Sequence, residues 1–345
     1  KKEMEKYFFS KNYKETKSAG NKAKTDIEEI LLTNGYKNIG VRSNYKGSLM
    51  GFIATLVSLL KACISIQPNS VLVLQYPLKK YYTFLCRIAH LRNCEVITII
   101  HDLGSFRRKR LTIEQEVSRL NQSDYIIAHN DAMKVWLQEH GVTSKLYSLG
   151  IFDYLSKSTP QPNTNKDQYR VLYAGALSPK KNPFLKQIGA IIKSYKFYLY
   201  GSGFEAQKNY NNIVNYKGFV PSDKLISTAE GDFGLVWDGD SISSCSGELG
   251  EYLKFNNPHK TSLYIRCHLP IIIWSKAALA PFIKENKIGF CIDSLDQIDN
   301  LLLELRKEDY DEIRKNVIKI SDKLSDGYYT TTALNKILNQ KENYK

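Results

Sequence analysis

Residues 232–276 read DFGLVWDGDSISSCSGELGEYLKFNNPHKTSLYIRCHLPIIIWSK and hold two short apolar runs separated by a polar stretch. The runs DFGLVW and PIIIW are rich in β-branched and aromatic residues and are bounded by Gly, Pro and Asp, a pattern typical of buried strands in a parallel sheet. After a long polar loop, HKTSLYIRC is predicted to form a helix that begins past Asn256-Asn257-Pro258. The stretch therefore predicts a strand, a loop, a helix and a second strand of one parallel sheet.

The predicted start of this helix carries Lys260, Thr261 and Ser262, just past the end of a strand. The first turn of a helix has backbone N–H groups without intrahelical partners, and two hydroxyls and an ammonium group would lie beside them. This combination is typical of an anion site, here most suitable for a diphosphate. The simpler alternative is that the hydroxyls only cap the helix and that the lysine is solvated.

Length and composition indicate a folded, two-domain protein. The chain has 345 residues, with 43% hydrophobic and 24% charged residues, and this length exceeds one ordinary core. Its six cysteines show no CxxC spacing and lie mostly in apolar segments, so we expect reduced thiols and a cytoplasmic location. We expect no signal peptide, because the apolar part of the opening KKEMEKYFFSKNYKE is too short.

The positive charge is concentrated in the first half. Residues 1–150 hold 23 Lys/Arg and 13 Asp/Glu, a net +10, whereas the remainder holds 26 and 22, a net +4. Basic and aromatic residues interleave over residues 79–92, and four more cations occupy residues 107–110, which suits an anionic membrane surface. Nucleic acid is a competing partner, but no recognised nucleic-acid module accompanies these residues. An anionic substrate or an ordinary solvated face would also account for them.

Residues 49–66, LMGFIATLVSLLKACISI, form an 18-residue apolar run whose only charge is Lys61. A membrane span needs about 20 apolar residues, so the run is slightly short. Strands and helices continue to alternate on both sides of it. We therefore expect a buried or surface-docked helix rather than a membrane span.

Strands and helices alternate along the chain with one interruption. The predicted strands are EKYFFS, NIGV, SVLVLQYP, CEVITIIHD and DYIIAHN, and then RVLYAG, KFYLYGSG, NIVNYKGFV, DFGLVW, PIIIW and GFCI. Helical segments separate them, one of them near 182–193, and this order indicates α/β architecture with two parallel, doubly wound sheets. Residues 156–168, SKSTPQPNTNKDQ, are predicted to be a linker between two domains, and helices follow over 308–340.

Ligands of doubly wound sheets bind at the carboxyl ends of the strands, so strand-end residues are the candidates. In the second domain, Gly201, Ser202 and Gly203 end one strand, and Tyr216, Phe219 and Val220 surround the end of the next. Glycine backbone and an aromatic ring suit the edge and face of a nucleobase, although turn and core packing explain them equally well. Ser178, Lys180 and Lys181 follow the first strand and would suit a phosphate; the alternative is a tight turn with solvated lysines.

Two acidic motifs also lie at strand ends. Asp238-Gly239-Asp240 has the D-x-D spacing that can hold a divalent cation on a diphosphate, but these carboxylates could equally orient Lys260 or a sugar hydroxyl. Because a lysine and a helix start already offer positive charge there, we expect no metal. In the first domain, His101-Asp102 follows a strand, and Asp102 could take a proton from an acceptor hydroxyl. The alternative is that Asp102 caps the next segment and His101 is packed.

The stretch FGLVWDGDSISSCSGELGEYLKFNNPHKTSLYI, followed by LPIIIWSKAALAPFIKENKIGF, closely resembles the corresponding region of the bacterial β-1,6-galactofuranosyltransferases of O-antigen and capsule assembly, within the GT-B superfamily. Shorter similar blocks are IIHD at 99–102, AHN at 128–130, IFDYL at 151–155 and YAGALS at 173–178. A more distant similarity, through His101-Asp102 and Lys260, is to glucosyltransferases that extend glycans on serine-rich adhesins.

The resemblance implies two Rossmann-like domains that face each other across a cleft. Residues 1–155 would bind the acceptor, 156–168 would be the linker, 169–320 would bind the nucleotide sugar, and 321–345 would form a final helix that packs toward the first domain. Galactofuranose would pass from UDP-galactofuranose, with inversion, to a lipid-linked saccharide in cell-surface polysaccharide synthesis, at the inner face of the plasma membrane. A UDP-glucose-dependent transferase and a non-catalytic sugar-nucleotide-binding subunit are the alternatives.

The resemblance also suggests roles for the strand-end residues. The uracil base would lie near Gly201 to Gly203 and near Tyr216 to Val220, and the diphosphate near Lys260 to Ser262, with help from Ser178 and Lys180 or Lys181. An inverting displacement needs a base opposite the leaving diphosphate. Asp102 is the first candidate, and the others are Asp238, Asp240 and Glu248. No metal or other cofactor is expected.

Overall fold

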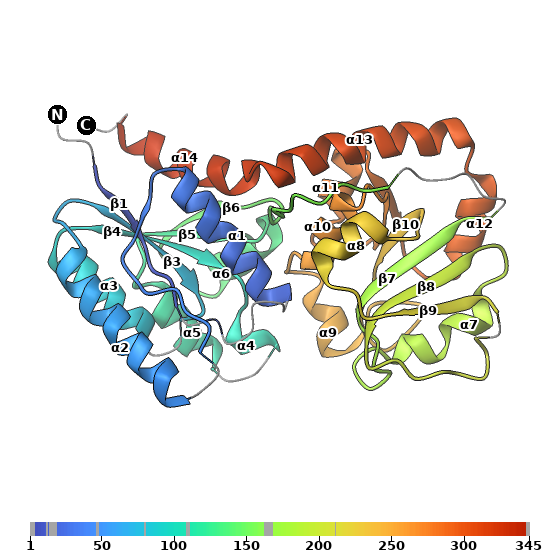
Figure 1. Ribbon diagram of the computed structural model, residues 1–345, viewed down its shortest axis with the longest axis horizontal. Coiled ribbons are helices and arrows are strands. Elements are labelled where there is room, and N and C mark those ends of the chain that lie inside the picture. The colour runs from blue at the N-terminus through green and yellow to red at the C-terminus, as the bar shows by residue number, and fades with distance from the viewer. Residues whose placement is uncertain are drawn as a thin grey trace. The chain divides into compact units, whose positions relative to one another are not determined.

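The computed structural model describes residues 4–11, 13, 19–45, 48–78, 81–107, 111–161, 168–210 and 212–342, and it contains two compact units (Figure 1). The first unit comprises Lys1–Asp153 and Gly327–Lys345, and the second comprises Tyr154–Asp326. Each unit is built on a six-stranded parallel sheet with helices, which confirms the predicted α/β class.

The sheet of the first unit has the strand order β2-β1-β3-β4-β5-β6. Its strands are β1 (Lys6–Phe8), β2 (Lys37–Asn38), β3 (Val71–Tyr76), β4 (Glu95–Ile100), β5 (Tyr125–Ala128) and β6 (Lys145–Ser148), and its helices are α1 (Ala19–Thr33), α2 (Ser48–Ser65), α3 (Tyr81–Leu91), α4 (Gly104–Arg107), α5 (Ile113–Leu120), α6 (Asp131–Glu139) and α14 (Tyr328–Glu342). Strand β6 was not among the predicted strands. This strand is partly exposed at the edge of the sheet and lacks the apolar run that marks a buried strand.

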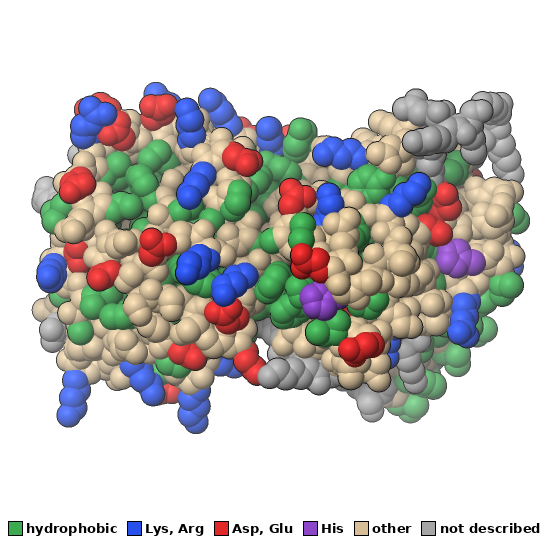
Figure 2. Space-filling model, turned by 180° about the vertical axis from the view of Figure 1, so that it is seen from behind, with side chains coloured by type: hydrophobic (Ala, Val, Ile, Leu, Met, Phe, Trp, Pro, Cys, Tyr) green, Lys and Arg blue, Asp and Glu red, His purple; other side chains and the backbone are tan. Residues whose placement is uncertain are grey.

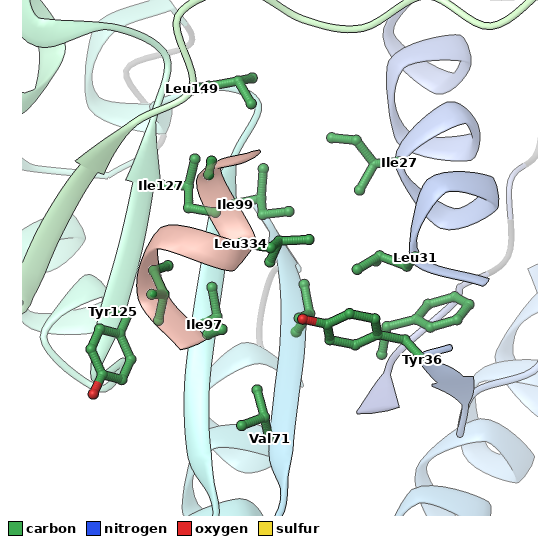
Figure 3. Packing of buried hydrophobic residues seen from close by; sticks show 14 of the residues in the cluster. Ile27, Leu31, Tyr36, Val71, Ile97, Ile99, Tyr125, Ile127, Leu149 and Leu334 are labelled. Atoms are coloured by element: carbon green, nitrogen blue, oxygen red, sulfur yellow. The ribbon is translucent and has the colours of Figure 1, made fainter. Parts of the chain in front are cut away.

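The core of the first unit lies between its sheet and the two helices α1 and α14. Figure 3 shows Ile27 and Leu31 of α1 and Leu334 of α14 directed toward the strands. There they meet apolar residues of β3, β4 and β5. The strand residues in this buried cluster include Val71, Val73, Ile97, Ile99 and Ile127. The last helix of the chain is therefore part of the core of the first unit.

The boundary of the final segment differs from the predicted 321–345. Helix α13 (Lys307–Ser325) stays with the second unit, and the chain passes to the first unit at Asp326–Gly327. The physical reason is the anchoring of α13: Arg266 donates a hydrogen bond to Ser321 Oγ at 2.8 Å, and Arg266 also reaches Ser156 O at 3.0 Å. Of the predicted linker, residues 162–167 lie outside the described residues.

A buried carboxylate holds the start of α14. Asp153 is only 3% exposed and accepts hydrogen bonds from the backbone N–H groups of Tyr329 at 3.1 Å and Thr330 at 2.7 Å. A carboxylate at a helix start satisfies N–H groups that have no partner within the helix. Burial raises the pKa of Asp153 from 3.8 to about 6, because loss of hydration outweighs these hydrogen bonds.

This raised pKa predicts a pH-dependent stability. The folded state binds the proton of this carboxyl more tightly than the unfolded state does. The contribution of protonated Asp153 to the free energy of unfolding is therefore full below pH 3.8 and is lost as the pH rises through about 6. The Asp153→Asn side chain does not titrate. We therefore expect wild type to lose up to about 2 kcal/mol of unfolding free energy relative to Asp153→Asn between pH 4.5 and 7.5. Urea unfolding at both pH values measures this difference, with the exposed Glu139→Gln as control; parallel pH profiles for wild type and Asp153→Asn would contradict it.

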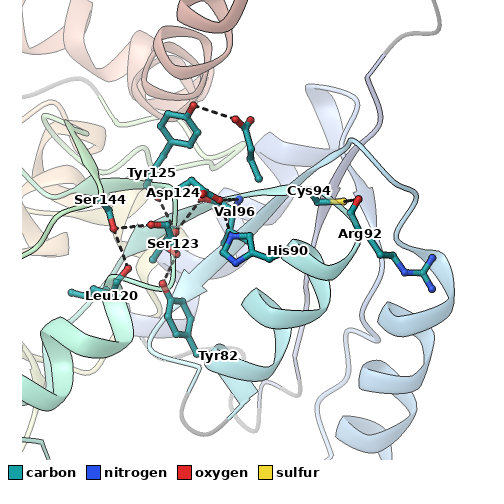
Figure 4. A network of polar contacts seen from close by, with 12 residues as sticks. Tyr82, His90, Arg92, Cys94, Val96, Leu120, Ser123, Asp124, Tyr125 and Ser144 are labelled. Atoms are coloured by element: carbon teal, nitrogen blue, oxygen red, sulfur yellow. Dashed lines mark hydrogen bonds and ion pairs between the residues drawn. The ribbon is translucent and has the colours of Figure 1, made fainter.

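A second polar network lies at the opposite, amino edge of the same sheet (Figure 4). Asp124 Oδ2 accepts a hydrogen bond from Val96 N at 2.8 Å and lies 3.0 Å from His90 Nε2. Beside it, Ser123 Oγ donates to the hydroxyl of Thr98 at 2.8 Å. Because ligands of such sheets bind at the carboxyl ends of the strands, we interpret this network as structural.

The sheet of the second unit has the strand order β12-β11-β10-β7-β8-β9. Its strands are β7 (Arg170–Ala176), β8 (Lys196–Ser202), β9 (Val214–Gly218), β10 (Phe233–Val236), β11 (Ile271–Trp274) and β12 (Gly289–Ile292), and its helices are the 3₁₀ helix η1 (Pro183–Lys186), α7 (Ile188–Ile191), α8 (Ser222–Thr228), α9 (Gly247–Tyr252), α10 (His259–Arg266), α11 (Ala280–Glu285), α12 (Gln297–Glu304) and α13. The helix predicted near 182–193 is two short turns, and the predicted loop before α10 contains α9.

Helix α10 lies directly on strand β10. A Cβ atom at Gly234 would overlap the ring of Tyr264, so only glycine permits this close approach. The Tyr264 hydroxyl accepts a hydrogen bond from Ala174 N at 2.8 Å, which ties the same helix to β7. The strands β7 and β10 and the start of α10 are thereby brought to one edge of the sheet.

The apolar run over residues 49–66 is a surface helix, α2 (Figure 1). Within the described ranges of the chain, none of the helices combines the length and the apolar character needed to cross a membrane. The prediction that this segment forms a helix is confirmed.

Candidate functional site

Three side chains meet at the carboxyl end of the central strands of the second unit. Lys260 Nζ, from α10, lies 2.8 Å from Asp238 Oδ1 and donates a hydrogen bond to the Tyr173 hydroxyl at 3.2 Å. That hydroxyl donates to Asp238 Oδ1 at 3.0 Å. The ammonium also lies 4.4 Å from the centre of the Tyr173 ring, a cation–π contact. The elements β7, β10 and α10 each contribute one member of this cluster.

The cluster is largely shielded from water. The side chains of Lys260 and Asp238 are 16% and 20% exposed, and Tyr173 is fully buried. Burial, with a further contribution from the Asp238 charge, holds the pKa of Tyr173 well above its usual value, so its hydroxyl keeps its proton and remains a donor. The result is a positive charge held in one position at the strand ends, where a phosphate oxygen could bind it.

The other two residues of the predicted anion site do not reach the surface. Thr261 and Ser262 are 0% and 1% exposed, and the backbone N–H of Thr261 donates to Pro258 O at 2.9 Å. The packing of α10 flat on β10 turns both hydroxyls into the interior. The expectation that these hydroxyls would face a ligand is therefore corrected, and of the three residues Lys260 alone extends to the strand ends.

The loop after β7 approaches the loop after β8. A Cβ at Gly201 would overlap Gly175 O, and Leu177 N donates to Ser202 O at 2.8 Å, so the two strand exits are held side by side. Lys180 and Lys181 extend from this loop into solvent, and Ser178 is partly exposed. The structure thus brings the predicted phosphate loop and the predicted base loop to the same edge.

Asn182 belongs to the site but was not among the candidates predicted from the sequence. It is 3% exposed, its amide donates to Ala176 O at 3.0 Å, and its carbonyl accepts from Gly239 N at 3.3 Å. It therefore joins the β7 loop to the turn that carries Asp238. A polar side chain directly before Pro183 was the only sign of this role in the sequence.

Aromatic rings line the exits of β8 and β9. The rings of Phe204 and Tyr216 stack with their centres 4.2 Å apart and their planes 6° apart, and the Tyr216 hydroxyl donates to Gly201 O at 3.0 Å. Tyr216 is 44% exposed and Phe219 is 63% exposed, while Val220 is half-buried. The two predicted glycine and aromatic motifs, at the ends of β8 and β9, thus lie together, with flat aromatic rings beside the strand ends.

The two carboxylates of the D-x-D motif diverge. Asp238 faces Lys260, whereas the exposed Asp240 packs against Gly247 at the start of α9, and its backbone N–H donates to Ser246 O at 3.2 Å. Glu248 is exposed in the first turn of α9. Among the residues described by the structure, no group of three or more His, Cys, Asp or Glu side chains is arranged to hold a metal ion. Asp238 is thus a partner of the lysine, one of the alternatives that the sequence left open.

Asp102, the first candidate for the base, lies in the first unit. It follows β4 by two residues and is partly exposed. The adjacent His101 is fixed by a 2.6 Å contact of its Nε2 with Gln75 Oε1 and by stacking on Phe152.

A buried carboxylate that the sequence analysis missed orders the turn after Asp102. Glu116, only 1% exposed, accepts hydrogen bonds from Gly104 N at 2.7 Å, Ser105 N at 2.9 Å and the Tyr76 hydroxyl at 2.9 Å. It thereby satisfies the free N–H groups at the start of α4.

His129 and Asn130, at the end of β5, are structural. Burial lowers the pKa of His129 to about 3, so the imidazole is neutral at physiological pH. Asn130 caps α6 by accepting a hydrogen bond from Met133 N at 2.9 Å.

The ion pair between Lys260 and Asp238 allows us to predict the effect of neutralising Asp238. In Asp238→Asn the ammonium of Lys260 loses its charged partner, while the amide oxygen can still accept from Tyr173. Because a charge-assisted hydrogen bond contributes about 1.5–3 kcal/mol, we expect kcat/KM to fall by roughly 10- to 100-fold. Steady-state kinetics checks this, with the exposed Asp223→Asn of α8 as control; equal kcat/KM for both variants would show that the ion pair does not position the lysine.

Two family domains match the chain. Residues 6–151 match the N-terminal domain, and residues 171–337 match the C-terminal domain, of the glucosyltransferase 3-like family. The chain is 32% identical over 335 residues to the beta-1,6-galactofuranosyltransferase WbbI of Escherichia coli (strain K12), covering 96% of this chain and 98% of that protein. It is 27% identical over 247 residues to glucosyltransferase 3 of Streptococcus gordonii, covering 70% of each. These matches confirm the resemblance seen in the sequence.

Solved structures support the fold. Anabaena Alr3699/HepE, determined in complex with UDP-glucose, matches with a TM-score of 0.59 over 98% of this chain and 99% of that chain. The sequence identity in this match is 12%, so it shows a shared fold.

Proposed function

The chain belongs to the glucosyltransferase 3-like family of glycosyltransferases, with the two Rossmann-like domains of the GT-B fold, and we propose that it transfers galactofuranose from UDP-galactofuranose to a hydroxyl of a saccharide. The observation that carries the donor class is the Lys260–Asp238–Tyr173 cluster, which holds a cation at the strand ends, on the same edge of the sheet as the stacked rings of Phe204 and Tyr216. The sugar is proposed from the 32% identity to a galactofuranosyltransferase over 96% of the chain.

In this proposal each part of UDP has a partner on the second unit. The uracil lies against the surface formed by Phe204, Tyr216 and Phe219, near the backbone of Gly201 to Gly203. The diphosphate lies at Lys260, with Ser178 and Lys180 or Lys181 around it. The ammonium at the strand ends supports this arrangement, because its charge can move from Asp238 toward a phosphate oxygen without a large movement of the chain.

We propose an inverting single displacement. The acceptor oxygen attacks the anomeric carbon, the bond from this carbon to the UDP oxygen breaks, and the proton of the acceptor hydroxyl passes to Asp102. UDP leaves with the bonding electrons, and Lys260 stabilises the negative charge that develops on it. Asp240 and Glu248 are the remaining candidates for the base, because Asp238 is engaged with the lysine. In this scheme the positive charge comes from the protein and no divalent metal takes part.

The proposed acceptor is a lipid-linked saccharide of cell-surface polysaccharide synthesis, and the proposed place of action is the cytoplasmic face of the membrane. The identity to a galactofuranosyltransferase supports the first part of this proposal. The net charge of +10 on residues 1–150 supports the second, because the cytoplasmic leaflet is anionic.

A donor panel tests the proposed function. The protein is incubated with UDP-galactofuranose, UDP-galactopyranose or UDP-glucose, with and without a saccharide acceptor and EDTA, and UDP release and glycoside formation are both measured. We expect turnover with UDP-galactofuranose that EDTA leaves unchanged. Turnover with UDP-glucose alone would support the second candidate, a glucosyltransferase, which the 27% identity to glucosyltransferase 3 favours. UDP binding without turnover of any donor would indicate a non-catalytic subunit, and loss of activity in EDTA would disprove the metal-free scheme.

A further inference from the structure

Helix α2 carries large apolar side chains on its outer face. Ile64 is 81% exposed and Leu49 is 70% exposed, and the apolar residues between them on that face are also exposed. The exposed set includes Leu49, Phe52, Ile53, Leu56, Leu60 and Ile64, whose spacing of three or four residues places them along one side of the helix. An apolar strip of this length on a surface marks a binding site for another molecule or for a membrane.

The inner face of α2 is made of small residues. Gly51, Ala54, Ser58 and Ala62 are buried, and Ser58 Oγ accepts a hydrogen bond from Val41 N at 2.8 Å. A helix that only covers a core turns its large apolar residues inward and its polar residues toward water. This helix does the reverse, so its outer face has a role other than stabilising the first unit.

The charge around α2 favours an anionic partner. Among the described residues, the cations on or beside the helix are Lys61 of α2, the exposed Arg87 of α3, and Arg92, which donates to Cys63 O at 2.9 Å and to Ile66 O at 2.8 Å; neither α2 nor α3 contains Asp or Glu. Helix α3 packs against α2 (Figure 1) and also exposes apolar and basic side chains, namely Phe84, Arg87 and Leu91.

Figure 2 shows the molecule from behind the view of Figure 1. Basic and acidic side chains are interspersed over the surface seen there, which is typical of a solvated face.

We propose that α2 is an interfacial helix that docks the first unit on an anionic lipid bilayer. Its outer face enters the boundary between headgroups and acyl chains, and the surrounding Lys and Arg side chains contact the headgroups. Its inner face stays packed on the protein, so α2 lies in the membrane plane and does not span it. This inference rests on the proposed function, in which the acceptor is lipid-linked. Docking through α2 would bring the first unit to the membrane surface where that acceptor lies.

Vesicle co-sedimentation without any donor sugar tests this proposal, so docking and sugar transfer can each fail alone. The wild-type chain is mixed with vesicles of phosphatidylcholine alone, or of phosphatidylcholine with phosphatidylglycerol, at low and high salt. We expect binding to the anionic vesicles that weakens at high salt. The double variant Leu56→Glu/Leu60→Glu should reduce the partition coefficient at least about tenfold. Leu303→Glu, at a leucine of α12 that is more exposed than Leu56 and Leu60, is the control and should bind like wild type.

Two results would overturn the proposal. One is equal vesicle binding by wild type and Leu56→Glu/Leu60→Glu, with circular dichroism and thermal unfolding unchanged. The other is a wild-type oligomer in light scattering that this double variant dissociates, without vesicle binding by either protein. That outcome would assign the outer face of α2 to contact between copies of the chain.

Discussion

Replacing Lys260 by alanine should slow sugar transfer by about 1000-fold. In the proposed reaction the ammonium faces the diphosphate, whose negative charge grows as UDP leaves, so its contribution is greatest in the transition state. Loss of one such electrostatic group costs about 100- to 1000-fold in rate, and we expect kcat/KM to fall by about the larger factor because Asp238 is left unpaired beside the phosphates. Steady-state transfer kinetics and calorimetric titration with UDP measure the two effects.

The control for this variant is Lys224→Ala, which removes an exposed lysine from α8 of the same unit. The double variant Lys260→Ala/Asp238→Asn adds a stringent test, because removing both charges relieves the repulsion between Asp238 and UDP. We expect it to bind UDP more tightly than Lys260→Ala alone, a non-additive result that only directly interacting residues produce. A near-normal kcat/KM for Lys260→Ala would overturn the assignment of the diphosphate to this lysine.

Replacing Asp102 by asparagine should also slow transfer strongly, but it should leave UDP binding intact. Asparagine has nearly the same shape as aspartate and cannot accept the proton of the acceptor hydroxyl. General base catalysis contributes about 100- to 10,000-fold, so kcat should fall within that range while the calorimetric Kd for UDP stays unchanged. This separation distinguishes a base from a residue of the donor site.

Glu139→Gln is the matched control for Asp102→Asn, because Glu139 is an exposed carboxylate of the same unit. Unchanged turnover in Asp102→Asn would move the base to Asp240 or Glu248, and the same measurement on their amide variants would then decide between them. Weaker UDP binding in Asp102→Asn would contradict the placement of Asp102 on the acceptor side of the reaction.

Where local sequence decides the structure, the predictions agree with it. DFGLVW and PIIIW form the strands β10 and β11, because continuous apolar runs are stable only when both faces of a strand are covered. The start of α10 also lies within one residue of its predicted place, because Pro258 stands immediately before the helix. By contrast, β6 and α9 were missed, since both are short and owe their conformation to neighbouring elements.

The candidate site shows the same division. Lys260 could be identified from its place at a helix start after a strand, which is a local property. Its partner Tyr173 could not be identified in this way, because a tyrosine inside an apolar strand is expected to be an ordinary core residue. Its hydroxyl meets Asp238 only because β7 pairs with β10. Glu116 was missed for a similar reason, since its four hydrogen bonds come from residues up to 40 positions away.

The sequence by itself determined the parallel α/β class, the break between two sheets, the strand-end location of the candidate site and the family resemblance. All of these follow from apolar runs, glycines and motifs that act over a few residues. Only the tertiary structure decided that Thr261 and Ser262 point inward, that Asp238 holds Lys260, and that α2 turns its large side chains outward. The physical reason is that the direction of a side chain depends on which surface its helix or strand packs against, and that surface comes from distant parts of the chain.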